Sequence, residues 1–368
     1  MSRIYIVMRL FYAHKKLRKI ASLVFCFLCI AFIVFSPSYV FDKDRYSLNL
    51  NKYLTSGQAK DVVLSLYHIE TFEGGSASRS KYLQRQAQSF NKQNPNCYIV
   101  VKTLSLDELI LNLQNGNIPD LFSFGTGAGE YIAGFMAELD KNSSIRNDLR
   151  SLGSKGGKTL CYPYMLSGYA IISKECLPIG DHDFSKLLQS KVNNKKIIKG
   201  ISIGEQNTNP YHVLQINGVR TSKDNTQVFD SQYSAYCNFV EGRCVSLLGS
   251  ARDVIRCKNR EQNGKLSSCY YYYLGGYSDL VQYIGVSTSN PNKLDLCKSF
   301  AKFLISEASQ RAIKDYGLFS VSNAKIYTDD YMSEFEDALL GDIFSLNAFC
   351  SLDEIIDARK RSFDAVFS

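Results

Sequence analysis

The sequence predicts an α/β fold in which helices cover largely parallel sheets. Between Asp61 and Phe124, apolar segments of strand length alternate with amphipathic segments of helical length. Strands joined by helices run parallel, because a right-handed crossover returns each strand in the same direction. Polar and glycine-containing turns follow these strands, and such sheets bind ligands at the carboxyl ends of their strands. With 45% apolar residues among 368, the chain is large enough for two hydrophobic cores.

The first strand is the apolar run over 61–68, which the polar segment 70–75 ends. Ser76 and Ser78 are candidate N-caps for the helix that follows, and Asn94-Pro95 stops it. Its apolar face repeats at helical spacing, with Leu83, Ala87 and Phe90. The alternation therefore begins with one complete strand and one complete helix.

A second strand is predicted over 98–104, where β-branched residues dominate. Ser105, followed by Asp107 and Glu108, opens a second helix that Gly116 closes. The third strand covers 121–124 and ends at a Gly-Thr-Gly turn. Two glycine turns thus lie at strand ends, which is the expected position of a ligand site.

The second half repeats this alternation with a break in it. The apolar run 160–173, interrupted by Pro163 and Gly168, predicts a strand that leaves one lobe, passes through an exposed hinge and enters another. The later elements expected are a helix over 232–245, strands over 244–249 and 269–274, two helices between about 292 and 317, and a helical tail over 328–361.

The N-terminal segment predicts export. Six basic residues and no acidic residue precede Ile20–Phe35, an apolar segment of sixteen residues. A secretory signal cut before Tyr39 and an uncut anchor extended through Val40 both fit this pattern. No lipoprotein-type small residue precedes either cysteine of the segment. A buried hairpin of a cytosolic domain is the remaining alternative.

Composition excludes several classes of function. Removing the six leader charges from the net charge of +8 leaves +2, which is too little basic character for nucleic-acid binding. Nine cysteines lie outside the leader without CxxC spacing, so we predict no metal site. Cys257 and Cys269 are spaced so that a disulfide between them is an open alternative.

No catalytic motif is present, and we predict neither enzymatic activity nor a cofactor. The segment Gly153–Thr159 is similar to a phosphate-binding loop, but its outer glycines stand one residue too close together. We interpret it as a solvated loop. A carboxylate pair of Glu70 with Glu73 or Asp279, as in glycosidases, keeps an exported hydrolase open as an alternative.

Seven segments, in order, resemble the extracellular solute-binding proteins of bacterial ABC importers, of the maltodextrin-binding type. They are ETFEGGSASR (70–79), FNKQNPNCYIVV (90–101), NGNIPDLFSFGTG (115–127), YPYMLSGYAIISKE (162–175), FVEGRCVSLLGSARD (239–253), LGGYSDLVQYIGVS (274–287) and NKLDLCKSFAKFLISEASQ (292–310), with YGLFSV following at 316–321.

The resemblance implies a periplasmic-binding-protein-like fold, in which two α/β lobes close around a small polar solute. The first lobe is expected over 60–162 plus 275–322 and the second over 163–274 plus 323–368, after a leader of 1–38. The ligand-facing residues it implies are Glu70, Thr71, Phe72, Glu73, Ser123, Gly125, Tyr164, Met165, Arg252, Tyr277 and Asp279. The partners implied are the membrane-spanning subunits of a permease, and the expected location is extracytoplasmic.

Sugars are the first expectation for the solute, although the chain has no tryptophan. Phe72, Tyr164 and Tyr277 are then expected to stack on sugar rings. A polyol phosphate, a peptide or a nucleoside is the alternative solute, and Arg252 suits an anionic group. A ligand sensor anchored in the membrane by residues 20–35 is the alternative function.

Overall fold

The computed structural model describes residues 61–73, 75–177, 199–328 and 330–367. These residues belong to one unit of the chain, Asp61–Ser368. The predicted leader and its apolar segment lie outside the described residues. Within the described part, no helix has the length and the apolar character needed to cross a membrane.

The first of two five-stranded sheets has the strand order β2-β1-β3-β12-β6. Its strands are β1 (Val62–Ile69), β2 (Cys97–Leu104), β3 (Leu121–Gly125), β6 (Cys161–Leu166) and β12 (Val281–Val286). β1 pairs in parallel with β2 and with β3, which confirms the predicted parallel alternation. β12 inserts antiparallel between β3 and β6, and the sequence patterns did not predict this strand. The sheet is therefore mixed.

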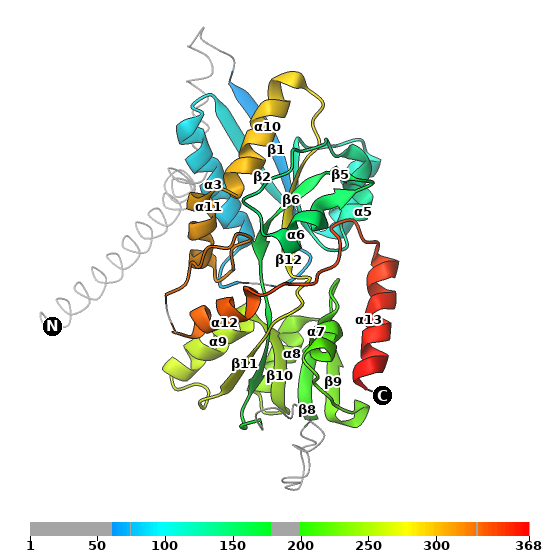
Figure 1. Ribbon diagram of the computed structural model, residues 1–368, viewed down its shortest axis with the longest axis vertical. Helices are drawn as coiled ribbons and strands as arrows, with labels where there is room; N and C mark the ends of the chain where they lie inside the picture. The colour runs from blue at the N-terminus through cyan, green and yellow to red at the C-terminus, as the bar shows by residue number, and fades with distance from the viewer. Residues whose placement is uncertain (1–60, 74, 178–198, 329, 368) are drawn as a thin grey trace, which may run out of the picture. The chain divides into compact units, whose positions relative to one another are not determined.

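Helices cover this first sheet. α3 packs on β2, and α10 packs on α3, β1 and β12 (Figure 1). The helical elements of this part are α3 (Arg79–Gln93), α4 (Leu106–Gln114), α5 (Gly129–Ile132), α6 (Asn147–Arg150), α10 (Pro291–Leu304) and α11 (Glu307–Ala312), with short 3-10 turns at Ala133–Phe135, Ser151–Gly153 and Ile313–Tyr316. A two-stranded hairpin, β4 (Ser154–Lys155) and β5 (Lys158–Thr159), stands apart from the sheet.

The second sheet has the strand order β11-β7-β10-β8-β9. Its strands are β7 (Tyr169–Ser173), β8 (Lys199–Gly204), β9 (Thr226–Phe229), β10 (Cys244–Ser250) and β11 (Tyr270–Leu274). Its helices are α7 (Pro210–Ile216), α8 (Gln232–Val240), α9 (Ala251–Gln262), α12 (Asp330–Leu339) and α13 (Leu352–Val366), with a 3-10 turn at Lys223–Asn225. α12 packs on β11, and α13, red in Figure 1, packs along α7.

The crossover between the sheets differs from its prediction. The run 160–173 forms two strands, β6 and β7, that belong to different sheets and meet at Ser167 and Gly168. Both of these residues are buried, so the predicted exposed hinge is wrong at this position. A Cβ at Gly168 would lie 2.7 Å from the Phe335 ring, which shows how closely α12 covers the crossover. Pro163 stays inside β6, where a register shift beside Tyr283 accommodates its missing N–H.

Two helix predictions extend too far. The helix predicted over 232–245 ends at Val240, because Gly242 turns the chain with a φ of 77°. The tail predicted over 328–361 is interrupted, since residues 340–351 separate α12 from α13. The elements over 199–229 were not predicted, because short buried strands give little periodic signal.

The cap of α4 provides a test of this local analysis. Ser105 Oγ accepts a hydrogen bond from the Glu108 N–H, and Glu108 Oε2 in turn accepts one from the Ser105 N–H. We expect Ser105→Ala to lower the free energy of unfolding by about 1 kcal/mol, measured by urea denaturation. Ser78→Ala is the matched control, because Ser78 precedes α3 but its hydroxyl contacts Ser80 rather than the helix N–H groups. Equal losses in both variants would contradict this interpretation.

Candidate functional site

The candidate site lies at the carboxyl ends of β1 and β3, where the sequence places its polar turns. Residues 70–73 leave β1, and Gly125 ends β3. A Cβ on Gly125 would lie 2.0 Å from Thr71 Oγ1 and 3.3 Å from the Phe72 ring. Only glycine therefore allows the turn after β1 to pack directly on the end of β3. Three of the predicted ligand residues are brought together in this way.

A buried polar network centred on Ser123 ties four strands of the first sheet together. Ser123 Oγ lies 2.9 Å from His68 Nδ1 and 2.8 Å from the Tyr164 hydroxyl, and it accepts a hydrogen bond of 3.0 Å from Gln282 Nε2. All four side chains are fully buried. Since buried polar groups need partners, this network fixes the strand ends relative to one another.

Arg79, the first residue of α3, is buried beneath the turn that follows β1. Its guanidinium donates to the Phe72 carbonyl at 2.5 Å and to Gln282 Oε1 at 3.3 Å, and its Nε lies 3.9 Å from Glu70 Oε1. Its Cζ also lies 4.1 Å from the centre of the Phe72 ring. Burial lowers the pKa of Arg79, while the neighbouring carboxylate of Glu70 raises it. The turn is therefore held in place by a charged group.

Glu70 is the most exposed carboxylate of this turn and remains ionised. Its hydrogen bond of 3.3 Å with His68 Nε2 is the main reason that its pKa falls to about 2, with Arg79 and Arg252 contributing and burial opposing. Burial lowers the pKa of His68, against the opposing effect of Glu70, and this favours the neutral ring. The ionised Glu70 then fixes the tautomer with the proton on Nε2, which leaves Nδ1 to accept from Ser123.

Glu73 links this turn to the second sheet. Its Oε2 lies 3.3 Å from Arg256 Nη1 and 3.9 Å from Arg252 Nε, and both arginines belong to α9. α9 packs on β10 and β7 of the second sheet. Glu73 and Arg256 are each 23% exposed, so the contact is only partly shielded from water.

Asp279 lies in a separate network at the connection between β11 and β12. Its carboxylate accepts hydrogen bonds from the Tyr169 hydroxyl at 2.8 Å and from the Asn209 N–H at 2.5 Å. Its carbonyl accepts one of 3.0 Å from Thr126, which follows β3. Burial raises the pKa of Asp279. Tyr277 is fully buried and packs against His212, with ring centres 4.7 Å apart.

The structure thus divides the predicted ligand residues into groups. One network joins Glu70, Thr71, Phe72, Ser123, Gly125 and Tyr164, and a charged contact joins Glu73 with Arg252. Tyr277 and Asp279 lie in the connection to β12, and Met165 is buried in β6 beside Gln282. The roles of these residues in ligand binding stay predictions.

Sequence reasoning missed four residues of the site: His68, Arg79, Gln282 and Arg256. His68 is one of three histidines outside the leader and closes an apolar strand, which is the one local signal that pointed to it. Gln282 and Arg79 are 203 positions apart, and no local pattern connects them.

The rings expected to stack on a sugar are all engaged by the protein. Phe72 is 5% exposed and lies under Arg79. Tyr164 is buried and stacks on Tyr82 with ring centres 6.4 Å apart, and Tyr277 is buried as well. Within this structure the accessible groups of the site are charged rather than aromatic.

The order of Ser123, His68 and Glu70 is similar to that of a nucleophile, a base and an orienting acid. Ser123 Oγ is fully buried, however, and already accepts from Gln282, so a substrate carbonyl has no access to it.

The described residues contain no group of three or more His, Cys, Asp or Glu side chains that could hold a metal ion. The nine cysteines outside the leader are free thiols in the structure, including Cys257 and Cys269.

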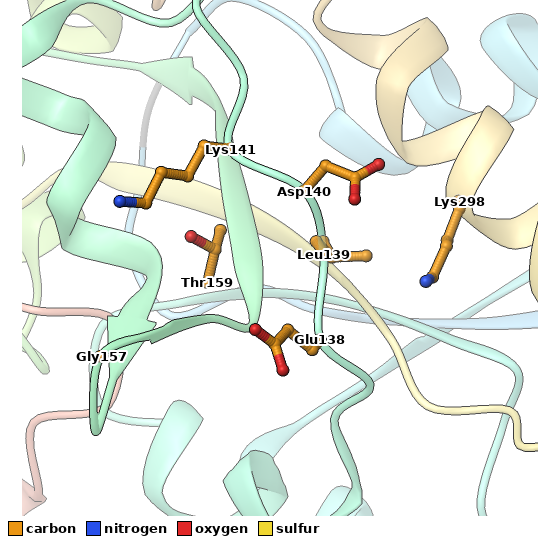
Figure 2. Close-up of a pocket in the computed structure, with 7 residues that line it drawn as sticks. All are labelled: Glu138, Leu139, Asp140, Lys141, Gly157, Thr159 and Lys298. Carbon is orange, nitrogen blue, oxygen red and sulfur yellow. The ribbon is translucent and has the colours of Figure 1, made fainter.

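A pocket of about 410 Å³ lies elsewhere on the first-sheet side. It is lined by Glu138, Leu139, Asp140, Lys141, Gly157, Thr159 and Lys298. Figure 2 shows Lys141 and Lys298 on opposite sides of the two acidic residues, Glu138 and Asp140. Two further lysines pair with these carboxylates: Lys158 Nζ lies 3.6 Å from Glu138 Oε2, and Lys302 Nζ lies 2.7 Å from Asp140 Oδ2. None of the predicted ligand residues lines this pocket.

The glycine-rich segment beside this pocket is a hairpin. Ser154 and Lys155 pair with Lys158 and Thr159 through a two-residue turn of Gly156 and Gly157, whose φ angles are 60° and 80°. Two glycines with positive φ are typical of a tight hairpin turn. No helix follows the segment directly, so the interpretation against a phosphate-binding loop agrees with the structure, although the segment forms a hairpin rather than a plain loop.

No family model and no curated protein matches the chain, but solved structures do. The GacH receptor of Streptomyces glaucescens, solved unliganded and with acarbose, is 14% identical over 83% of this chain and 99% of its own, with a TM-score of 0.56. The galacto-N-biose-/lacto-N-biose I-binding protein of the ABC transporter from Bifidobacterium longum is 12% identical over 84% and 98%, with a TM-score of 0.56. Trichodesmium IdiA (FutA), solved with iron and citrate, is 14% identical over 83% and 100%, with a TM-score of 0.58.

At these identities the likeness shows the fold. The chain has the two-lobed α/β fold of periplasmic solute-binding proteins, which confirms the fold class predicted from sequence. The resemblance to ABC solute-binding proteins is thereby confirmed as a likeness of fold. Several other similar structures were solved with a bound sugar, such as the maltotriose-binding protein of Thermus thermophilus and MalE of Bdellovibrio bacteriovorus, each with maltotriose.

The ionisation of Glu70 can be tested directly. We expect His68→Phe to raise the pKa of Glu70 from about 2 toward the ordinary 4.5, because the largest stabilising hydrogen bond is lost. Carboxyl NMR of labelled glutamate measures this pKa. A lowered folded-state pKa contributes stability that is present above pH 4.5 and is lost as the pH falls toward 2. The free energy of unfolding of His68→Phe should therefore depend less on pH between 4.5 and 2 than that of the unchanged protein.

His212→Phe is the matched control, since His212 contacts Tyr277 rather than Glu70. Its Glu70 should still titrate near pH 2. A Glu70 pKa that does not change in His68→Phe would show that the hydrogen bond does not control the charge of this carboxylate.

Proposed function

We propose that the protein is an extracytoplasmic solute-binding protein that captures a small polar solute, with a sugar or oligosaccharide as the first candidate, for an ABC importer. The observation that carries the proposal is the gathering of polar residues from distant segments at the ends of β1 and β3, with Glu73 reaching α9 of the second sheet. This is where a two-lobed binding protein closes around its solute. The fold of the similar structures supports the same conclusion.

The roles of the side chains follow from their exposure and charge. Glu70 is ionised and its side chain is 42% exposed, so its oxygens are suited to accept hydrogen bonds from hydroxyl groups of the solute. Arg252 is 36% exposed and offers donors from the opposite side. Ser123, Tyr164 and Gln282 support these groups from behind, because they are buried and hydrogen-bonded to one another.

We place the lobe boundary at the crossovers between the two sheets. The first crossover lies at Ser167 and Gly168, and the second follows β11 and contains Asp279. This assignment moves residues 163–166 from the second lobe to the first, because they belong to β6. Lobe movement then requires rotation about these two connections and about the segment that precedes α12, where the chain passes to the second lobe again.

The proposed location outside the membrane rests on the sequence of the leader. Its basic flank and apolar segment favour export, and they leave the protein either free or tethered outside the membrane. The partners are then the membrane-spanning subunits of a permease. The protein is proposed to bind its solute without chemical change, since Ser123 is inaccessible.

A thermal-shift panel tests the proposal. A solute that binds only the folded protein stabilises it by RT ln(1 + [L]/Kd), about 2.7 kcal/mol at one hundred times Kd. We expect one class among neutral sugars, acidic sugars, polyol phosphates, peptides, nucleosides and ferric citrate to raise the melting temperature of the full-length protein. The shift should shrink in Glu70→Gln, while Glu307→Gln, an exposed glutamate on α11, should leave it unchanged. A panel without any shift would contradict the proposed function.

A further inference from the structure

The contact between Glu73 and α9 brings one carboxylate of the first-sheet side to two arginines, of which Arg256 is also paired with Asp253 of its own helix. One carboxylate oxygen, Oε2 of Glu73, lies 3.3 Å from Arg256 Nη1 and 3.9 Å from Arg252 Nε. Glu73 belongs to the connection between β1 and α3, while both arginines lie in the first two turns of α9. A single carboxylate from the first-sheet side thus faces two guanidinium groups from the second-sheet side.

The two arginines are held differently. Arg256 also bonds Asp253 Oδ1 at 3.2 Å and lies 5.2 Å from the centres of the Tyr233 and Tyr236 rings. These contacts orient Arg256 independently of Glu73. Arg252, by contrast, is 36% exposed, and no described residue accepts a hydrogen bond from its guanidinium. Arg252 therefore presents a planar set of donors of the kind that binds carboxylate and phosphate oxygens in pairs.

The surroundings of Arg252 favour an oxyanion further. Arg252 is the second residue of α9, so the partial positive charge of the helix N-terminus adds to its own.

We propose that the solute is anionic, and that its carboxylate or phosphate group takes the place of the Glu73 carboxylate beside Arg252 and Arg256. The inference rests on the proposed function and narrows its substrate class to acidic sugars or sugar phosphates. Glu70 is suited to bind their hydroxyl groups, and α9 binds their charge. The anion then joins the two sheets in the way that Glu73 joins them in the protein alone.

Competition between Glu73 and the solute determines whether the affinity for an anionic solute rises or falls in Glu73→Gln. An internal carboxylate that occupies the arginines lowers the apparent affinity for an external one by the fraction of molecules it blocks. Glu73→Gln removes this competitor, so the affinity for anionic solutes should rise by about 2- to 10-fold. If Glu73 instead bound the solute itself, the same variant would lose affinity. The two roles of Glu73, competitor or solute ligand, therefore predict opposite changes in affinity for Glu73→Gln.

The experiment is a calorimetric titration of the full-length protein with three matched series: oligomers of a hexuronic acid, their neutral hexose counterparts, and hexose phosphates. We expect the uronate or the phosphate series to bind at least about tenfold more tightly than the neutral one. The affinity for the anion should fall at least about tenfold in Arg252→Gln, and less in Arg252→Lys, which keeps the charge but not the planar donors. Tighter binding of the uronate series would identify the anionic group of the solute as a carboxylate, and tighter binding of the phosphate series would identify it as a phosphate.

Arg243→Gln is the matched control, because Arg243 lies on the same lobe, is 59% exposed and pairs with Glu241 rather than with the site. It changes the net charge by the same amount and should leave the affinity unchanged. Equal binding of neutral and anionic sugars, with reduced affinity in Glu73→Gln, would overturn the inference and leave the proposed function intact. Absence of binding in all three series and in the wider thermal-shift panel would overturn both.

Discussion

The burial of the Arg79 guanidinium is the constraint on which the geometry of the site depends. A guanidinium removed from water is costly unless hydrogen bonds and charges compensate it. Arg79 obtains them from the Phe72 carbonyl, from Gln282 and from Glu70, which come from the turn after β1 and from β12. The start of α3, the end of β1 and β12 must therefore meet at one point. Glu70 and Glu73 take their positions from that turn.

Two kinds of contact connect the first sheet with the second, and their burial separates their roles. Asp279 is fully buried and bonded to Tyr169, Asn209 and Thr126, so breaking its contacts would leave a buried carboxylate without partners. The Glu73–Arg256 contact is 23% exposed on both sides, and water can replace either partner at small cost. The lobe movement that we propose would break the second contact and turn about the first.

Local patterns were sufficient for elements whose signals lie within one segment, such as α4 with its capping box and the parallel pairing of β1 with β3. They failed where tertiary pairing decides, as for β12, which joins β3 and β6 from more than 110 positions away along the chain. The topology predicted that the turns after β1 and β3 would lie at one edge of the sheet, where Thr71 and Phe72 do pack against Gly125. Whether Tyr164 would be exposed depended on Tyr82 and Ser123, which no spacing rule connects with it.

The contacts of the aromatic rings bear on which solutes the proposed site would accept. Phe72 already contacts Arg79, and Tyr277 contacts His212, so neither ring offers an open face for stacking. The accessible groups are an ionised carboxylate at Glu70 and a guanidinium at Arg252. A site built from charges discriminates more strongly than an apolar one, because a solute that lacks the complementary group leaves a charge desolvated and unpaired. Selectivity in this protein should then follow the charge of the solute more than the number of its rings.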